Sequence, residues 1–208
     1  MHKMNEEQLD FINHHKIDIL KCLDVKGSIL TKDLKLYMKI YDFYFAYNCS
    51  PCKRDHTIKN RLGQCIFCNT QAIAIHLREH GKGNLYIAAS RWGKWIKIGC
   101  TTNYEKREKY LNEYKGYGFK ADWKILAVAK VDEMGVRERE VHYKLEKYRE
   151  YGIQYYRGKE LKRSNELFRC NYEKAYEVMQ EFCKANKFHF KVIDMKFDKY
   201  NFRKLIRP

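Results

Sequence analysis

The chain lacks any run of 18 apolar residues, so a helix that crosses a membrane is not expected. Its first ten residues, MHKMNEEQLD, also lack the apolar core of a signal peptide. We therefore expect an intracellular protein, in the cytoplasm or in the nucleus of a eukaryotic or virus-infected cell. Because such compartments keep thiols reduced, the eight cysteines are expected to be metal ligands or free thiols and not disulfides.

Acidic residues are too few to balance the basic ones. The 42 Lys and Arg residues outnumber the 26 Asp and Glu residues, which gives a net charge of +16. Residues 1–48 hold seven of each sign, residues 49–83 hold six basic and two acidic residues, and residues 84–208 hold 29 and 17. This distribution favours a polyanion, and nucleic acid over a membrane, because no basic amphipathic helix with a continuous apolar face stands out. The alternative is a solvated basic surface without a partner.

Of the 208 residues 45% are hydrophobic, which is enough for the core of a globular protein. Residues 1–48 are expected to form its helical N-terminal element. Apolar residues recur at mostly helical spacing in residues 5–23, residues 26–28 interrupt the pattern, and Thr31 opens a second helix. The balanced charge indicates a packing or dimerisation element rather than a DNA reader. The sequence assigns this element no function and leaves the oligomeric state open.

Residues 49–83 are expected to form a zinc module with a joining helix. Two Cys-x-x-Cys pairs are separated by twelve residues, and each pair places two thiolates on one side of a tight turn. Four thiolates suit a structural Zn²⁺ site, whereas a redox site needs only one such pair. Unrelated reduced thiols are the alternative. The predicted zinc ligands are Cys49, Cys52, Cys65 and Cys68.

Nearby histidines offer a second ligand set. His76 and His80 are four residues apart and share a helix face, so they could complete a site with Cys65 and Cys68. We favour the four cysteines, because the gap between Cys68 and His76 is short for a finger of that kind. His56 is a third histidine close to the pairs. The remaining cysteines are expected to be core or surface thiols: Cys22, Cys100, Cys170 and Cys183.

The next segment predicts a β-hairpin followed by a helix. Apolar, aromatic and β-branched residues are dense in residues 84–89 and again in residues 95–98, with Gly93 between them. The second strand ends at Gly99. The polar residues 101–103 then supply candidate N-cap oxygens for the helix.

Side chains suited to phosphodiester cleavage occur in and after this hairpin. The reaction needs a proton acceptor, a cation that stabilises the charged intermediate and usually a divalent metal ion. Tyr86 and Lys97, on partner strands, could face one side of the hairpin and meet Arg107 of the helix. A later helix, indicated by apolar residues at helical spacing, carries three further polar candidates, namely Glu138, Glu140 and His142.

The rest of the chain predicts a small sheet flanked by helices. Residues 122–131 are apolar on both faces and are expected to form a central strand, with a helix over residues 133–149 packed on it. Residues 166–169 are expected to form a returning strand, and residues 171–185 the last helix.

Residues 187–208 form a basic, aromatic tail. Such a tail either contacts nucleic acid, with its cations following the phosphates, or closes the domain as an edge strand and helix. We favour the second alternative.

Residues 83–183 resemble the GIY-YIG endonuclease superfamily. Asn84, Leu85 and Tyr86 correspond to the first tripeptide, and residues 97–99 correspond to the second. One branch, found in phages and large viruses and also in bacteria and some fungi, has a hydrophobic-Lys-Ile-Gly strand, a Thr-Thr-Asn turn, a Glu-x-x-hydrophobic-His helix and a Glu-hydrophobic-Phe strand. The matching residues are 96–99, 101–103, 138–142 and 166–168. The chain departs from most members where Asn84 replaces a glycine and Lys97 replaces the second tyrosine.

The resemblance implies an α/β nuclease domain over residues 84–186, with a mixed or antiparallel sheet flanked by helices. It implies that Glu138 binds a catalytic Mg²⁺ or Mn²⁺ and that Arg107 clamps the phosphate, since an arginine fork donates two parallel hydrogen bonds. Tyr86 is then the candidate general base, and Lys97 an electrostatic aid or alternative base. His142 either joins catalysis or makes a structural hydrogen bond.

The implied function is a metal-dependent endonuclease. DNA is preferred to RNA on the resemblance alone, because these residues do not distinguish the sugars. A restriction enzyme, a mobile-element nuclease and a viral repair or host-degrading nuclease would share these features. The alternative is a non-catalytic, zinc-dependent DNA-binding protein that keeps the nuclease fold. The joint presence of Tyr86, Arg107 and Glu138 favours the enzyme.

Overall fold

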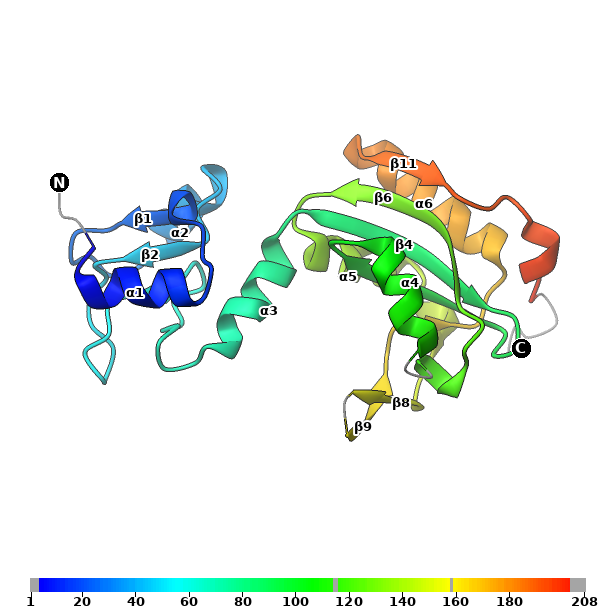
Figure 1. Cartoon of the computed structure of the whole chain (residues 1–208). Coiled ribbons are helices and arrows are strands. Elements are labelled where there is room, and N and C mark those ends of the chain that lie inside the picture. Colours follow the sequence, from blue (N-terminus) through cyan, green and yellow to red (C-terminus); the bar gives the residue numbers. More distant parts are fainter. Residues whose placement is uncertain (1–3, 114–115, 158, 203–208) are drawn as a thin grey trace. The chain divides into compact units, whose positions relative to one another are not determined.

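The computed structural model describes residues 4–113, 116–157 and 159–202. The chain divides into two compact units, Met1–Glu79 and His80–Pro208 (Figure 1). Within the described ranges, no helix is both long and apolar enough to span a membrane. None of the eight cysteines, all of which lie in these ranges, forms a disulfide.

The first unit contains a small three-stranded sheet in the order β1-β2-β3. Strand β1 pairs with β2 in parallel, and β2 pairs with β3 in antiparallel orientation. The elements of the unit are α1 (Glu6–His14), the 3-10 helix η1 (Ile19–Lys21), β1 (Cys22–Asp24), α2 (Lys32–Ile40), β2 (Phe45–Tyr47) and β3 (Lys59–Asn60), followed by α3 (Gln71–His80).

Both expected helices of residues 1–48 are present, but the segment is not purely helical. Helix α1 begins with a capping box, in which the side chains of Asn5 and Gln8 each accept the other's backbone N–H. The side chain of Thr31 caps α2 by accepting the backbone N–H of Leu34 at 3.2 Å. The helical expectation is wrong for Cys22–Asp24 and Phe45–Tyr47, which form the strands β1 and β2. Each is three residues long, too short to show the alternation that identifies a strand in a sequence.

The helices and the cysteine-rich segment share one core. Ile12 and Phe45 pack in the same cluster as Ile58 and Ile66. The pairing of β2 with β3 joins the same two segments. Because a segment of about twenty residues buries little apolar surface of its own, the helices supply the core that the cysteine-rich segment lacks.

The second unit is a six-stranded sheet flanked by helices, in agreement with the expected α/β fold. Its described strands follow the order β11-β6-β4-β5-β10-β7, and every pair is antiparallel. The elements are β4 (Gly83–Ser90), β5 (Trp95–Thr101), α4 (Tyr104–Glu113), η2 (Tyr117–Phe119), β6 (Lys124–Val131), α5 (Met134–Lys144), η3 (Glu146–Tyr148), β7 (Arg149–Glu150), β8 (Ile153–Arg157), β9 (Glu160–Ser164), β10 (Leu167–Phe168), α6 (Tyr172–Asn186), β11 (His189–Val192) and η4 (Phe197–Tyr200).

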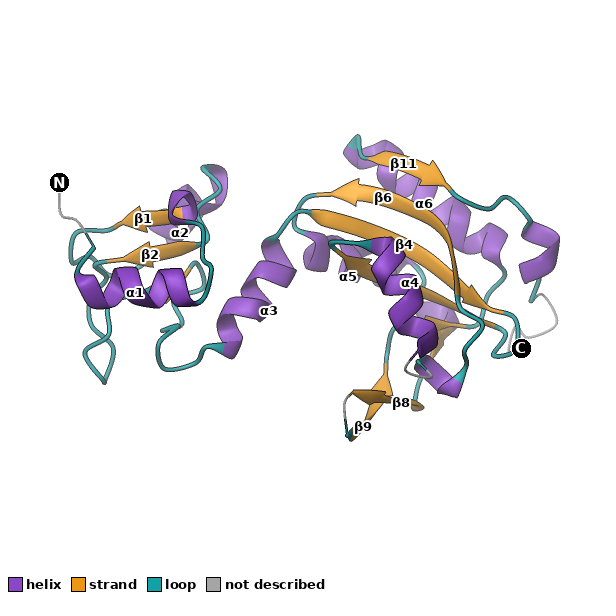
Figure 2. Ribbon diagram, viewed as in Figure 1, coloured by secondary structure: helices purple, strands orange, loops and turns teal. Residues whose placement is uncertain are grey.

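Strand β4 separates two cores, because its side chains alternate between the faces of the sheet. Leu85 and Ile87 lie in the larger core, which α5 and α6 cover. Tyr86 and Ala88 lie in a smaller core together with Leu111 of α4. Figure 2 shows α4 in front of the long strands β4 and β6, with α6 behind them.

The described part of the C-terminal tail packs onto this domain. Strand β11 pairs with the outer side of β6, and Tyr200 and Phe202 are buried in the larger core. The ring of Phe197 stacks on that of Tyr172, with 4.8 Å between centroids. These contacts support the packing alternative for residues 187–202. Residues 203–208 lie outside the described part of the chain.

Deletion of residues 196–208 should therefore destabilise the protein. The deletion removes Tyr200 and Phe202 from the core, and losing one buried aromatic side chain costs about 3–5 kcal/mol. We expect a lower melting temperature in calorimetry and an unchanged slope of log affinity against log salt for duplex DNA. The double variant Lys196→Ala, Lys199→Ala is the matched control, which removes charge and should keep the melting temperature. A truncated protein with its full melting temperature and a smaller salt slope would show that the tail contacts nucleic acid instead.

Candidate functional site

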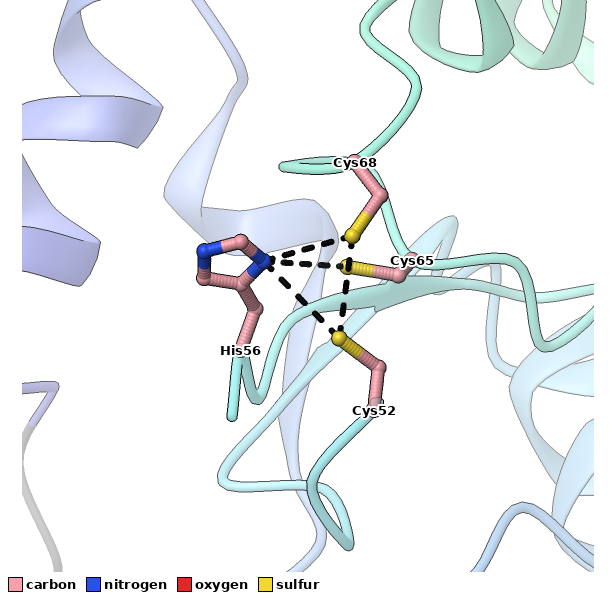
Figure 3. Close-up of side chains that lie close together, drawn as sticks. All are labelled: Cys52, His56, Cys65 and Cys68. Atoms are coloured by element: carbon pink, nitrogen blue, oxygen red, sulfur yellow. Dashed lines mark hydrogen bonds between the residues drawn. The ribbon is translucent and has the colours of Figure 1, made fainter. Parts of the chain in front are cut away.

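Four potential metal-ligand atoms meet in the first unit. The Sγ atoms of Cys52, Cys65 and Cys68 and the Nδ1 atom of His56 all lie within 4.8 Å of one another (Figure 3). The Sγ atoms of Cys52 and Cys68 are 3.7 Å apart, and Nδ1 of His56 lies 3.4–3.8 Å from the three sulfurs. Tetrahedral Zn²⁺, with bonds of about 2.0–2.3 Å, separates its ligands by about 3.4–3.8 Å. The group therefore fits a zinc ion.

His56 takes the place that we expected for Cys49. Cys49 lies outside the group, and its buried thiol donates to the carbonyl of Ala46 at 3.4 Å. Burial raises the pKa of the Cys49 thiol to about 11. The ligand set that the structure brings together is thus Cys3His. The spacing of the cysteines does not predict this set, because His56 belongs to neither Cys-x-x-Cys pair.

Local contacts hold two of these ligands in position. The ring of His56 stacks on that of Phe67, with 4.9 Å between centroids and 17° between planes. The backbone N–H of Arg54 donates to Sγ of Cys52 at 3.4 Å and lowers the pKa of that thiol to about 6. The ring stacking and this hydrogen bond position two of the four ligand atoms.

The alternative set with His76 and His80 does not form. His76 is buried in the core of the first unit, where its ring lies edge-on to those of Tyr44 and Phe45. Nδ1 of His80 lies 3.4 Å from Oε1 of Glu133 in the second unit. Neither histidine belongs to the metal-ligand group.

A second polar cluster lies on the α4 side of the β4–β5 hairpin. Tyr86 pairs directly with Gly99 across the strands, and Lys97 lies two residues before Gly99, so both side chains project to the same face. The Tyr86 ring covers Gly99 so closely that a Cβ there would lie 2.3 Å from the tyrosine oxygen. Glycine is required at this position because the ring occupies the space of any larger side chain.

Arg107 of α4 meets Tyr86 above this glycine. Its Nε donates to the hydroxyl oxygen of Tyr86 at 3.1 Å, and its guanidinium carbon lies 5.3 Å from the centre of the Tyr110 ring. Within the described residues this is the one hydrogen bond of the guanidinium, so both terminal NH₂ groups remain for a ligand. Burial opposes the charge, but Tyr86, together with Tyr117 and Glu166, outweighs burial and raises the pKa of Arg107.

Lys97 is a buried cation with a fixed partner. Its side chain has no exposed surface, its amine pairs with Oε2 of Glu166, and its nitrogen lies 4.0 Å from the centre of the Tyr117 ring. The hydroxyl of Tyr117 donates to the same oxygen of Glu166 at 3.1 Å. Burial alone would lower the pKa of Lys97, but the Glu166 carboxylate and the two tyrosine oxygens outweigh burial and raise it.

Tyr117 and Glu166 were missed as site residues. Glu166 had a signal, because it begins the Glu-hydrophobic-Phe strand of the resemblance. No sequence pattern indicates Tyr117 as a site residue, because a single tyrosine in a turn predicts no function. Its ring reaches the cluster only through the fold of η2. Burial, followed by the Lys97 and Glu166 charges acting in opposite directions, raises the pKa of Tyr117 to about 12.

Glu138 and His142 lie one turn apart on α5, beside β5. Oε2 of Glu138 accepts the thiol of Cys100 at 3.1 Å, and the residue is 6% exposed. Cys100 belongs to the larger core, on the face opposite Tyr86. Nε2 of His142 donates to the carbonyl of Ile98 at 3.1 Å. Glu138 and His142 thus hydrogen-bond to residues of β5. Tyr86, Lys97 and Arg107, in contrast, lie on the α4 side of the sheet. Glu140 is on the surface and pairs with Arg137.

The titration of His142 should make the protein sensitive to acid. Burial lowers the pKa of His142, with Glu138 opposing, so the folded protein favours neutral imidazole. The contribution of neutral His142 to the stability of the fold is complete above the pKa of about 6.5 that histidine has in the unfolded chain. It is lost as the pH falls through the lower pKa of His142 in the folded protein. In His142→Gln an amide can still donate to Ile98 without titrating. The melting temperature of the wild type should therefore fall toward that of the variant between about pH 7.5 and about pH 5. A gap that stays constant or widens toward acid pH would contradict this account.

No curated protein and no solved structure matches the chain. Of the two polar sites, only the cluster around Lys97 and Arg107 lies in a segment that matches a known family. The zinc-compatible group lies outside any matched segment, whereas Tyr86, Lys97, Arg107, Glu138 and Glu166 lie inside one. This segment, residues 83–183, matches the family model of the T5orf172 domain, a phage-associated domain related to nuclease-type folds.

Proposed function

We propose that this protein is an endonuclease that hydrolyses phosphodiester bonds in DNA, and that a zinc ion stabilises its first unit. The observation that carries the enzymatic proposal is the cluster around Arg107. There, a guanidinium is held by Tyr86 and keeps both terminal NH₂ groups for a ligand, inside the segment that matches the T5orf172 domain. The basic excess of residues 84–208 supports a polyanionic substrate.

Arg107 binds the scissile phosphate in this proposal. A guanidinium donates two parallel hydrogen bonds to phosphate oxygens and stays charged at any physiological pH. Its Nε is already occupied by Tyr86, which fixes the plane of the fork before the substrate arrives. A cation oriented in advance stabilises the developing charge of the transition state without reorganisation.

Tyr86 and Lys97 are assigned positioning roles. Both side chains are 0% exposed, which favours an indirect action over the direct proton transfer that the resemblance implies. Tyr86 orients Arg107, and Lys97 orients Glu166, whose side chain is 28% exposed. The raised pKa of Lys97 keeps it protonated and so favours electrostatic aid over action as a base. We assign to Glu166 the orientation of the attacking water.

A catalytic Mg²⁺ or Mn²⁺ would activate the water and neutralise charge on the phosphate. The described residues fit such an ion only in part. Glu138 supplies one carboxylate, which matches the one or two that Mg²⁺ commonly takes. It is only 6% exposed, however, and belongs to no group of three or more possible ligands among the described residues. Its hydrogen-bond partner Cys100 also lies on the sheet face opposite Tyr86. Phosphate binding by Arg107 does not depend on this ion.

Loss of Arg107 should slow cleavage strongly and leave the fold intact. We expect Arg107→Ala to cut supercoiled plasmid at least about 100-fold more slowly than the wild type, because oriented charge of this kind contributes about that factor. Lys106→Ala is the matched control, since it removes an exposed cation from the preceding position of α4. Gel analysis of nicked and linear plasmid, with and without Mg²⁺, measures both rates. Equal loss in the two variants would indicate a general charge effect and remove Arg107 from the site.

Glu138 is tested by removing its charge alone. Glu138→Gln keeps an acceptor for the Cys100 thiol, so the helix should stay in place. We expect no Mg²⁺-dependent cleavage and unchanged affinity for duplex DNA in fluorescence anisotropy. Full activity of this variant would exclude Glu138 as the metal ligand.

Zinc in the first unit is proposed from the Cys3His geometry. Four protein ligands close the coordination sphere, which is typical of structural sites, and metal binding then contributes directly to folding. His56→Ala should lose zinc in metal analysis and melt at a lower temperature, whereas Cys49→Ser should keep its zinc. The reverse result would restore the set of four cysteines.

A DNA-binding protein without turnover is the second candidate. The departure at Lys97, which stands where most of the superfamily has a tyrosine, favours it. Wild-type protein that binds duplex DNA but leaves plasmid intact with Mg²⁺ and with Mn²⁺ would select this candidate.

A further inference from the structure

The hairpin β8–β9 is separate from the main sheet. Its strands pair with each other over five residue pairs and form a sheet of their own. Figure 1 shows this hairpin extending away from the long strands β4 and β6. Two-stranded ribbons of this length have little stability alone, so the contacts at its base decide whether it is held rigidly.

Those contacts are made with the cluster around Lys97 and Glu166. The ring of Tyr155 stacks on that of Tyr117, with 4.4 Å between centroids, and Tyr117 donates to Glu166. At the end of β9, the hydroxyl oxygen of Ser164 accepts the backbone N–H of Glu166 at 3.1 Å. The hairpin is therefore anchored on the residues that we assign to the candidate active site.

One face of the hairpin carries side chains suited to base recognition. Gln154 and Arg163 are directly opposite each other across the strands and are exposed. Neither makes a hydrogen bond or ion pair with any residue that the structure describes. The opposite face carries Tyr155, which packs on the cluster, and Lys162, which pairs with Glu160 at 2.6 Å. The face with Gln154 and Arg163 also carries Tyr156, whose ring lies 5.8 Å from that of Phe119 in η2, and the half-exposed Leu161. Gln154 and Arg163 are the polar side chains of this face that remain available to a partner.

We propose that β8–β9 enters the major groove of double-stranded DNA beside the phosphate bound by Arg107, and that Gln154 and Arg163 contact base edges there. The proposal rests on the proposed function for the position of the phosphate. The major groove of B-form DNA, about 12 Å wide, admits a two-stranded ribbon, and glutamine and arginine form bidentate pairs with adenine and guanine. The deep, narrow major groove of A-form RNA does not admit one, so the structure favours a DNA duplex. Because the hairpin is anchored on the cluster, the bases contacted would lie at a fixed distance from the cut.

Sequencing the ends produced from a library of random duplexes tests this inference. Wild-type protein should show base preferences at a fixed offset from the cut. Arg163→Ala and Gln154→Ala should each lose a preference of about 5- to 150-fold, the discrimination typical of one bidentate pair. Lys162→Ala, at the residue before Arg163 in the same strand but on the opposite face, is the matched control and should keep the wild-type pattern. All variants should melt like the wild type, since the three side chains are exposed.

A binding experiment separates this inference from the proposed function. Without added Mg²⁺, wild-type protein should protect guanine N7 atoms in the major groove from methylation by dimethyl sulfate, and Arg163→Ala should not. Protection without any cleavage would support the hairpin contact while refuting the endonuclease. Unchanged cleavage pattern and protection in both Arg163→Ala and Gln154→Ala would overturn the inference. Equal affinity of the wild type for a matched RNA duplex would also overturn it.

Discussion

The buried ion pair between Lys97 and Glu166 is the interaction on which the candidate active site depends. Lys97 occupies the middle of β5 with no exposed side-chain surface, and a charge so far from water is tolerated only with a partner. Removing either member would leave an uncompensated charge, typically at a cost of about 3–5 kcal/mol. The partner comes from a residue 69 positions later in the chain. The ion pair thus fixes where β10 begins relative to β5.

The same constraint organises the aromatic residues around it. The Tyr117 ring lies against the amine of Lys97, and its hydroxyl donates to Glu166, so the cation has both a face-on ring and a hydrogen-bonded carboxylate. Tyr86 lies over Gly99 on the same face and directs its oxygen to Arg107. A buried lysine at this position of β5 requires charge balance as well as hydrogen bonding. Glu166 and Tyr117 meet that demand.

Long elements with strong periodicity could be predicted from the sequence, and short or tertiary features could not. The strands β4, β5 and β6 and the helix α6 lie where apolar spacing indicated them, because each buries enough side chains to impose a pattern. Helix α5 begins as expected but ends at Lys144, five residues before the expected end, and β7 begins at Arg149. The strands β1 and β2 and the hairpin β8–β9 impose none, since they are very short or mostly exposed. The ligand group shows the same limit. Cysteine spacing located the loop, but which four atoms converge depends on how the loop folds, and His56 displaced Cys49.

The connection between the hairpin and the cluster bears on how substrate binding could affect chemistry. Only Asn165 separates the end of β9 from Glu166, and Ser164 is hydrogen-bonded to the Glu166 backbone. Tyr155 stacks on the tyrosine that donates to the same carboxylate. A duplex held by the hairpin would therefore restrain Glu166 through both the backbone and the Tyr117 hydroxyl. Binding energy from bases distant from the cut is useful for catalysis only if it improves the geometry at the reacting phosphate. This pair of contacts provides the physical route by which it would do so.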